Sequence, residues 1–193
     1  MRIIRLTEKK PDNWGEMKDW FNKRTNRHIT LVKKWCGEIA DYDKKRFGEL
    51  ESRAEEHDRS KFEDPEMDPY VYVSWDYKCK DDKVEWDKPD GIDDMMTDAT
   101  EHHVNSNRHH PEFHSEKKGR INRKDRDKPP EEMIDATKMP DLDVAEMVAD
   151  WMAMSEEKGN TPKSWADKNV DVRWKFTDAQ KKLIYELIKE VWE

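Results

Sequence analysis

Histidine is the residue type in this chain that is best suited to carry chemistry. All seven histidines lie between positions 28 and 114, and five of them fall between 102 and 114. Neutral imidazole binds divalent transition metals, and its proton exchanges near neutral pH. Three of the histidines and one late carboxylate occupy positions that helical spacing turns inward. They are His28, His57, His103 and Asp150.

Two predicted helices in the N-terminal part of the chain carry the first pair of these groups. The stretch from about Thr25 to Tyr42 has an apolar stripe at helical spacing, and His28 heads that stripe. The stretch from about Asp43 to His57 has a second stripe, which His57 ends. Both imidazoles are therefore expected to face the interior of a helical domain.

Two later predicted helices carry the other pair. In a helix from about Ile92 to Asn107, His103 follows the inward-facing Ala99 by four residues and so shares its face. In a strongly amphipathic helix over Asp141–Lys158, Asp150 lies between apolar residues three positions before it and four positions after it. Four separate helices thus aim a polar group at the core.

The cost of burial makes a shared ligand the simplest explanation of this placement. One buried polar group without a partner costs roughly 1–3 kcal/mol, and a charged group costs more. Four such groups would consume much of a folding free energy of about 5–15 kcal/mol. Taken singly, each histidine is more often an ordinary, partly buried residue. Taken together, they predict one or two divalent transition metal ions, with Mn, Fe, Co, Ni and Zn as candidates.

The order of these residues resembles the HD-domain superfamily of metal-dependent phosphohydrolases. Members of that superfamily carry a helical His, an adjacent His-Asp pair, further histidines and a lone Asp on a late helix. The stretch HDRSKF, residues 57–62, is similar to the HDxGK stretch of many members, with Ser60 where Gly is usual. The matching positions here are His28, His57, Asp58, His103, His109 or His110, and Asp150.

Two further blocks resemble a small uncharacterised branch of that superfamily, which is found in bacteria and phages. The first block is AxxxHxxxNxHHPE over residues 99–112, and the second is EMxxDW over residues 146–151. The resemblance covers roughly residues 26–155. It implies an all-α fold, a compact helical HD-domain-like bundle.

The resemblance implies that His28, His57, Asp58 and Asp150 bind one metal ion. The adjacency of His57 and Asp58 has a structural consequence. Neighbouring side chains on a helix point about 100° apart, because a helix has 3.6 residues per turn. Both can reach one ion only where the helix ends, and Pro65 follows soon after.

His103 and His110 have two candidate roles under the same resemblance. They could hold a second ion that Asp58 bridges, or they could contact phosphate oxygens and protonate the leaving group. His109 could replace His110, because the sequence cannot distinguish adjacent histidines. Lys61 follows His57 by four residues and is a candidate phosphate contact, with a surface lysine as the alternative. The catalytic candidates are Asp58, Lys61, His103 and His110.

Several nearby residues have plainer expected roles. Glu112 could orient a histidine, although a helix-terminal charge is the stronger expectation. Asn107 is expected to cap its own helix, His102 and His114 to lie on the surface, and Cys36 to be an inert core residue.

Length and periodicity indicate a single helical domain over residues 1–193. The resemblance implies that its core covers about residues 26–155. A first helix is expected over about Asn13–Asn22. A last helix is expected over about 178–192, after a capping box at Thr177. No internal repeat is present.

Other segments are less sharply defined by their pattern. Residues 1–6 could form a short N-terminal strand, and residues 115–130 read as a mobile charged loop. The basic run over 117–128 could attract an anionic substrate or simply be solvated. Residues 70–79 could be a strand or a buried helix. Its aromatic residues could stack a nucleobase, although core packing is the stronger expectation; they are Tyr70, Tyr72 and Trp75.

Charge and composition restrict the compartment and the partners. The formal net charge is −8, from 37 basic and 45 acidic residues. This balance disfavours long nucleic acid as the main partner. No apolar run is long enough to span a membrane, and the N-terminus lacks the apolar core of a secretory signal. Two cysteines without a paired spacing fit a reducing cytoplasm.

These observations favour a metal-dependent phosphohydrolase that acts on a small phosphate ester, with a nucleotide as the expected substrate. A di-iron oxygenase of the HD type is an alternative enzyme, and a non-catalytic module that binds a nucleotide or a partner protein is an alternative without catalysis. Either a monomer or a homo-oligomer fits the sequence.

Overall fold

The computed structural model describes residues 10–117 and 130–193. Over these ranges the chain is predominantly helical, which confirms the all-α class. The one small sheet pairs β1 (Ile134–Asp135) with β2 (Trp174–Lys175) in parallel. The helices are α1 (Trp14–Tyr42), α2 (Lys44–Phe47), α3 (Leu50–Arg53), the 3-10 turn η1 (Arg59–Phe62), α4 (Met67–Asp81), α5 (Ile92–Ser106), α6 (Pro111–His114), α7 (Asp141–Lys158), α8 (Pro162–Asn169), α9 (Asp178–Leu187) and a π-helical turn over Ile188–Trp192.

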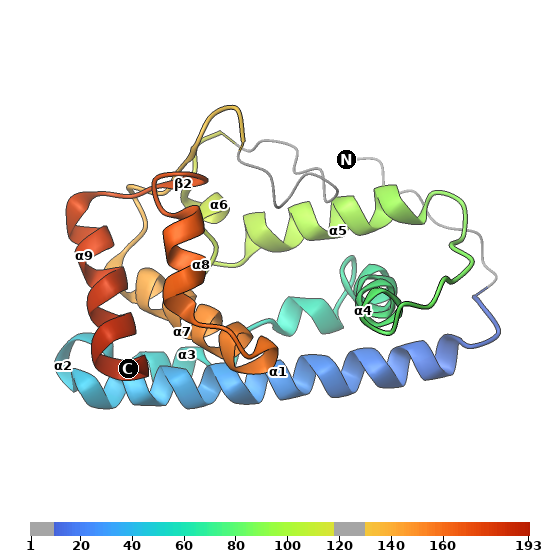
Figure 1. Ribbon diagram of the computed structural model, residues 1–193, viewed down its shortest axis with the longest axis horizontal. Coiled ribbons are helices and arrows are strands. Elements are labelled where there is room, and N and C mark those ends of the chain that lie inside the picture. Colours follow the sequence, from blue (N-terminus) through green and yellow to red (C-terminus); the bar gives the residue numbers. More distant parts are fainter. Residues whose placement is uncertain (1–9, 118–129) are drawn as a thin grey trace.

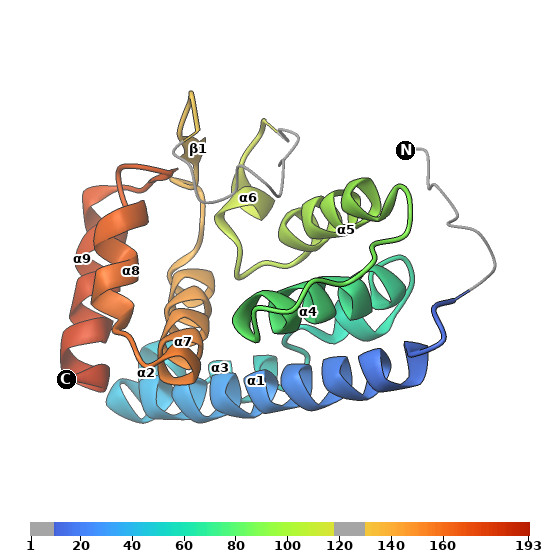
Figure 2. The same cartoon turned by 45° about the vertical axis from the view of Figure 1, so that its right-hand side comes forward.

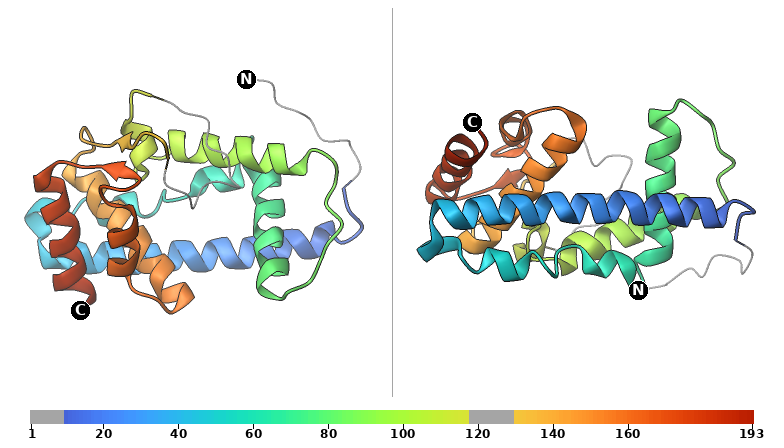
Figure 3. Two further views of the ribbon diagram at one scale, coloured as in Figure 1. Left: turned by 45° about the horizontal axis from the view of Figure 1, so that its top comes forward. Right: turned by 90° about the horizontal axis from the view of Figure 1, so that it is seen from below.

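Helix α1 runs along the whole length of the molecule and organises the rest (Figure 1). It packs against α7 near its C-terminal end and against α4 near its N-terminal end. Helices α7, α8 and α9 gather on one side, while α4 and α5 lie on the other (Figure 2). Figure 3 shows that α4 runs across the direction of α1.

Two apolar clusters lie along α1, one on each side of its middle. Phe21 belongs to the cluster with α4 and α5, which also contains Met96. Val32 belongs to the cluster with α7 and α9, which also contains Val148. His28 lies between the two on the same buried face. The middle of α1 is therefore the place where a polar site interrupts the core.

The two helices predicted over Asn13–Asn22 and Thr25–Tyr42 are in fact one helix. The residues that join them contain no Gly or Pro, and Lys and Arg are good helix formers. Thr25 is buried inside α1 instead of capping a second helix. This continuity lets one rigid element contact both apolar clusters.

The single helix predicted over Asp43–His57 is wrong. The chain forms two short helices, α2 and α3, with a turn at Gly48 between them. A Cβ atom at Gly48 would lie 2.7 Å from the backbone oxygen of Lys44, so the tight turn depends on glycine. The helix ends at Arg53, and His57 therefore lies in the turns that precede η1.

The remaining predictions for the described residues are mostly confirmed. The helix over Asp141–Lys158 has the predicted bounds, and α9 begins at the predicted capping box of Thr177. The ambiguous segment 70–79 is helical and belongs to α4. Its aromatic residues are buried, as core packing requires; they are Tyr70, Tyr72 and Trp75.

One helix was not predicted, and two predicted segments lie wholly or mostly outside the described residues. Helix α8 was not expected. The proposed strand over residues 1–6 and most of the charged loop over 115–130, including 118–128 of its basic run, lie outside the described residues. None of the helices in the described ranges combines the length and the apolar character that a bilayer-crossing segment needs.

Candidate metal centre

The carboxylate of Asp58 lies at the centre of the histidine cluster. Its Oδ2 atom is 3.7 Å from Nε2 of His28 and 3.9 Å from Nε2 of His57. The Nε2 atom of His28 is also 3.0 Å from Oδ1 of Asp150. These side chains come from α1, from the turn before η1 and from α7. The first predicted set of four ligands is therefore brought together.

The other oxygen of Asp58 faces the second set of histidines. Its Oδ1 atom is 3.1 Å from Nε2 of His103 and 3.7 Å from Nε2 of His109. His110 packs against both of these rings, with ring centroids 4.9 Å and 4.2 Å away. The prediction of either His109 or His110 is thus too narrow, because the structure brings both imidazoles to the site.

Among residues 10–117 and 130–193, three overlapping groups of side chains have ligand atoms within 4.8 Å of one another, which is close enough to hold a metal ion. The first joins residues of α1 and α7, and the other two involve the histidines that follow α5. The groups are His28, His57 and Asp150; His57, Asp58 and His109; and His103, His109 and His110.

The backbone at Asp58 explains how adjacent residues reach one centre. Asp58 has φ 59°, the left-handed conformation that residues other than glycine rarely adopt. The left-handed residue separates the turn carrying His57 from η1. The adjacent side chains can therefore converge where regular helix would splay them about 100° apart. Such backbone strain is common at functional sites.

Unpartnered atoms at the centre fit a cation. The buried atoms His57 Nε2, Asp58 Oδ1 and His110 Nε2 have no hydrogen-bond partner in the described part of the chain. The outward Nδ1 atom of His103 donates to Glu66 at 2.9 Å. In the neutral ring the lone pair is then on Nε2 and faces Asp58, and a cation is the partner that both atoms lack. Neutral imidazoles around carboxylates form a donor set for a divalent transition metal.

The charges at the site favour ionised carboxylates. Burial disfavours charge on His28, but Asp150, Glu157 and Asp58 outweigh it and raise its pKa to about 9. Burial opposes ionisation of both carboxylates, but Lys61 and the neighbouring histidines lower the pKa of Asp58, and His28 with the other histidines lowers the pKa of Asp150.

The two adjacent histidines are held neutral. Burial and the neighbouring imidazole of His57 lower the pKa of His109 to about 3. Burial and neighbouring imidazoles also lower the pKa of His110 well below its usual value. Both rings therefore keep a free lone pair at neutral pH, which metal binding requires.

Lys61 contacts the centre directly. Its Nζ atom donates to Oδ2 of Asp58 and lies 5.3 Å from the ring centroid of Tyr70. Its side chain is 17% exposed, so the alternative of a free surface lysine is wrong. In this structure the ammonium neutralises Asp58, and a contact with phosphate stays a prediction.

Glutamates lie next to the Nδ1 atoms of the histidines, and the sequence had suggested no role for them. Glu146 lies 3.1 Å from Nδ1 of His57, Glu66 lies 2.9 Å from Nδ1 of His103, and Glu157 lies 3.7 Å from Nδ1 of His28. Glu146 precedes Asp150 by one helical turn, and that spacing is a usable signal. The segment around Glu66 carries no comparable pattern, because it follows an irregular stretch.

Two histidines assigned to the surface are instead partly buried and bound. His102 lies 2.7 Å from Glu66. His114 lies 3.3 Å from Asp143, a fully buried carboxylate on α7. Both expectations were wrong. Periodicity did not show that His102, on α5, lies beside Glu66, and α6, which carries His114, is too short for periodicity to define its faces.

The predictions for capping and for the cysteine agree with the structure. The side-chain amide of Asn107 donates to the backbone oxygen of His103 at 2.8 Å and so caps α5. Cys36 is fully buried, and burial raises the pKa of its thiol, which keeps it in the unreactive form. Glu112 accepts a hydrogen bond from the indole nitrogen of Trp174 at 3.1 Å, which joins α6 to β2.

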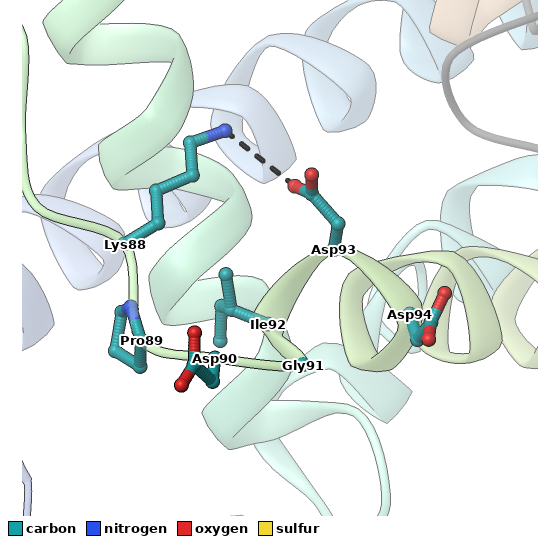
Figure 4. A pocket seen from close by; sticks show the side chains of 7 residues that line it. All are labelled: Lys88, Pro89, Asp90, Gly91, Ile92, Asp93 and Asp94. Carbon is teal, nitrogen blue, oxygen red and sulfur yellow. Dashed lines mark hydrogen bonds and ion pairs between the residues drawn. The ribbon is translucent and has the colours of Figure 1, made fainter.

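A shallow pocket lies at the start of α5, away from this cluster (Figure 4). It is lined by residues 88–94, and none of the candidate ligands contributes to it. Lys88 points toward Asp93 across the pocket, with 3.5 Å between the charged atoms. An open acidic turn of this kind does not compete with the histidine cluster as a functional site.

Comparison with known proteins places the chain in a family. Searches of curated proteins and of solved structures found no match. A family described as "Family of unknown function (DUF5662)" matches residues 17–190, a range that includes every candidate ligand named above. Because this match covers most of the chain, the protein belongs to the family of unknown function DUF5662.

Proposed function

We propose that this protein is a metal-dependent phosphohydrolase that uses two divalent ions and acts on a small phosphate ester, with a nucleotide as the favoured substrate. The observation that carries the proposal is the placement of Asp58. One of its oxygens faces His28 and His57, and the other faces His103 and His109. A carboxylate placed in this way can bridge two ions.

Metal ions bound here would supply Lewis acidity, which lowers the pKa of water and polarises a phosphoryl group. The protein's own residues bind and orient the substrate. Lys61 already donates to Asp58, and a phosphate oxygen offers it a second anionic acceptor. His110 is neutral, and in the tautomer that carries the hydrogen on its unpartnered Nε2 atom it can donate to a phosphate oxygen. Both residues are therefore candidate phosphate contacts.

The solvent-accessible side of the site indicates where a substrate would enter. The side chains of His28, Asp150 and Lys61 are 10%, 17% and 17% exposed, whereas that of His57 is fully buried. A ligand would therefore approach past His28, Asp150 and Lys61. Partly exposed polar side chains of this kind suit a small polar substrate.

The test is a phosphate-release screen on the full chain. Protein stripped with EDTA is reloaded separately with Mn, Fe, Co, Ni or Zn and assayed against nucleotides and other small phosphate esters. The expected result is metal-dependent release of phosphate that is lost in His57→Ala. Asp64→Asn, a change at an exposed carboxylate in the same segment, is the matched control. Tight nucleotide binding without turnover would instead favour a binding module.

A di-iron oxygenase is the second candidate function, and one observation favours it. Asp58 and five neighbouring side chains could serve as ligands. Six is the number of protein ligands that two irons need in that chemistry. Protein that holds two irons per chain and consumes oxygen with a small organic substrate would support this candidate. Phosphate release under anaerobic conditions with Mn or Co would oppose it. The six residues are His28, His57, Asp58, His103, His109 and Asp150.

A further inference from the structure

The outward-facing nitrogens of two candidate ligands meet separate buried glutamates. Nδ1 of His57 lies 3.1 Å from Oε1 of Glu146, and Nδ1 of His103 lies 2.9 Å from Oε2 of Glu66. Both glutamates are buried. Because an ionised carboxylate can only accept hydrogen bonds, each Nδ1 atom must carry the hydrogen. In the neutral, metal-binding form of each ring, Nε2 then carries the lone pair and faces Asp58.

The two glutamates are anchored by different residues. Glu146 accepts from Arg53 at 2.6 Å, and the same guanidinium pairs with the buried Asp143. This anchor joins α3 to α7. It holds the glutamate against His57 from the side opposite Asp58.

The anchor of Glu66 uses other elements. Its Oε2 atom accepts from the hydroxyl of Ser60 at 2.9 Å, and its Oε1 atom lies 2.7 Å from Nδ1 of His102. This anchor joins η1, the start of α4 and α5. Within residues 10–117 and 130–193, the two glutamates have no hydrogen-bond partner in common.

We infer that Glu146 and Glu66 are positioning residues for different halves of the metal centre. One half lies on the Oδ2 side of Asp58 and contains His57, and the other lies on the Oδ1 side and contains His103. Glu146 fixes the ring of His57, and Glu66 fixes the ring of His103. Each hydrogen bond selects the tautomer with a lone pair on Nε2 and makes that nitrogen a stronger electron-pair donor to a metal ion. Glu146 also lies 3.6 Å from Nδ1 of His109, so its influence extends toward the shared edge of the two halves. The inference rests on the proposed metal centre, and not on the reaction that the centre performs.

Metal binding to the stripped full chain tests this division. The wild-type protein, Glu66→Gln and Glu146→Gln are titrated with Mn²⁺ by calorimetry, and bound metal is counted by mass spectrometry. Glutamine keeps the size of the side chain and one acceptor, so the fold should persist. The expected result is that each variant loses about 10–100-fold in affinity for one of two ions and keeps the other.

A double-variant experiment identifies which half each glutamate serves. In a chain that already carries His103→Ala, Glu66→Gln should add no further loss, because the ring that it positions is gone. Glu146→Gln should still weaken the remaining ion in that chain. Glu63→Gln removes an exposed carboxylate three residues before Glu66, and Glu156→Gln removes one on α7, the helix that carries Glu146; both controls should bind like the wild type.

The outcomes separate a structural role from a positioning role. Equal weakening of both ions in both variants, or a matching loss of thermal stability, would show that the glutamates only support the fold and would overturn the inference. Unchanged affinity would overturn it as well. A wild-type chain that binds no metal refutes both the inference and the proposed function. A chain that binds two ions selectively but hydrolyses no phosphate ester refutes the function alone.

Discussion

The Nε2 atom of His28 on α1 lies 3.0 Å from the Oδ1 atom of Asp150 on α7. These residues are far apart in the chain, and the packing of α1 against α7 brings them together. Asp58 Oδ2 lies 3.7 Å from the same Nε2 atom, so His28 lies between the two carboxylates. The two oxygens of Asp58 face different histidines, so the two halves of the proposed centre can be tested separately by mutation.

The first prediction compares the two carboxylates. Asp58 faces both groups of histidines, whereas Asp150 contacts only His28 among the candidate ligands in the described part of the chain. Asp58→Asn should therefore reduce bound metal to near zero, while Asp150→Asn should leave one ion bound. Metal counts on purified, reloaded protein measure this, with Asp64→Asn as the control. Equal metal loss in both variants would contradict a bridging role for Asp58.

The second prediction concerns pH and the metal-free protein. The folded pKa of His28 is raised to about 9 from an unfolded value of 6.5, so its ion pair with Asp150 is fully present below pH 6.5. That contribution, about 3 kcal/mol, is lost as the pH rises through 9. Urea unfolding in EDTA between pH 6.5 and 9.5 should show this loss in wild type, but not in His28→Gln. Parallel pH profiles for the two proteins would refute it.

The third prediction concerns metal removal. A ligand that binds only the folded state stabilises it by about 2.7 kcal/mol at one hundred times its dissociation constant. For a chain of this size, that should shift the unfolding midpoint by roughly 5–10 °C. Thermal unfolding with Mn²⁺ and then with excess EDTA measures the shift. An identical midpoint under both conditions would count against an ion buried in the core.

The two buried thiols provide an independent check of the same prediction. Cys36 and Cys79 are buried, and burial raises the pKa of both. A thiol reagent should therefore label them only when the protein opens. Labelling should be faster in EDTA than with metal, and fully unfolded protein should react at once in either condition. Rapid labelling of the folded, metal-loaded protein would show that the cysteines are accessible.

The fourth prediction concerns the turn between α2 and α3. A Cβ at Gly48 would meet the backbone oxygen of Lys44 at 2.7 Å, so Gly48→Ala should destabilise the fold by about 1–3 kcal/mol. Gly37→Ala is the matched control, because no atom lies within 4 Å of its added Cβ inside α1. The control should stabilise the protein by about 0.4–1 kcal/mol. Urea unfolding measures both changes, and the same sign for both would contradict the prediction.

The sequence was sufficient to predict which polar residues on the long helices face the core. Apolar periodicity showed that His28, His103 and Asp150 occupy inward faces, and the structure buries or partly buries all three. The capping box at Thr177 marked the start of α9. These features depend on local spacing, which the sequence contains directly.

Local spacing could not predict where the helices end or which groups they face. The break at Gly48 depends on a backbone oxygen four residues earlier, and the convergence of His57 with Asp58 depends on a left-handed residue. Periodicity carries no record of either feature. For the same reason, the sequence analysis assigned His102 to the surface although it binds Glu66.

The sequence by itself determined that the protein is helical and that histidines and carboxylates face its interior. Only the tertiary structure decided that those groups meet around Asp58, that His109 and His110 both lie at the candidate site, and that Glu66 and Glu146 contact the outward nitrogens of His103 and His57. The physical reason is that helical periodicity reports which face of an element is buried. The partner of that face is set by the packing of elements distant in the chain.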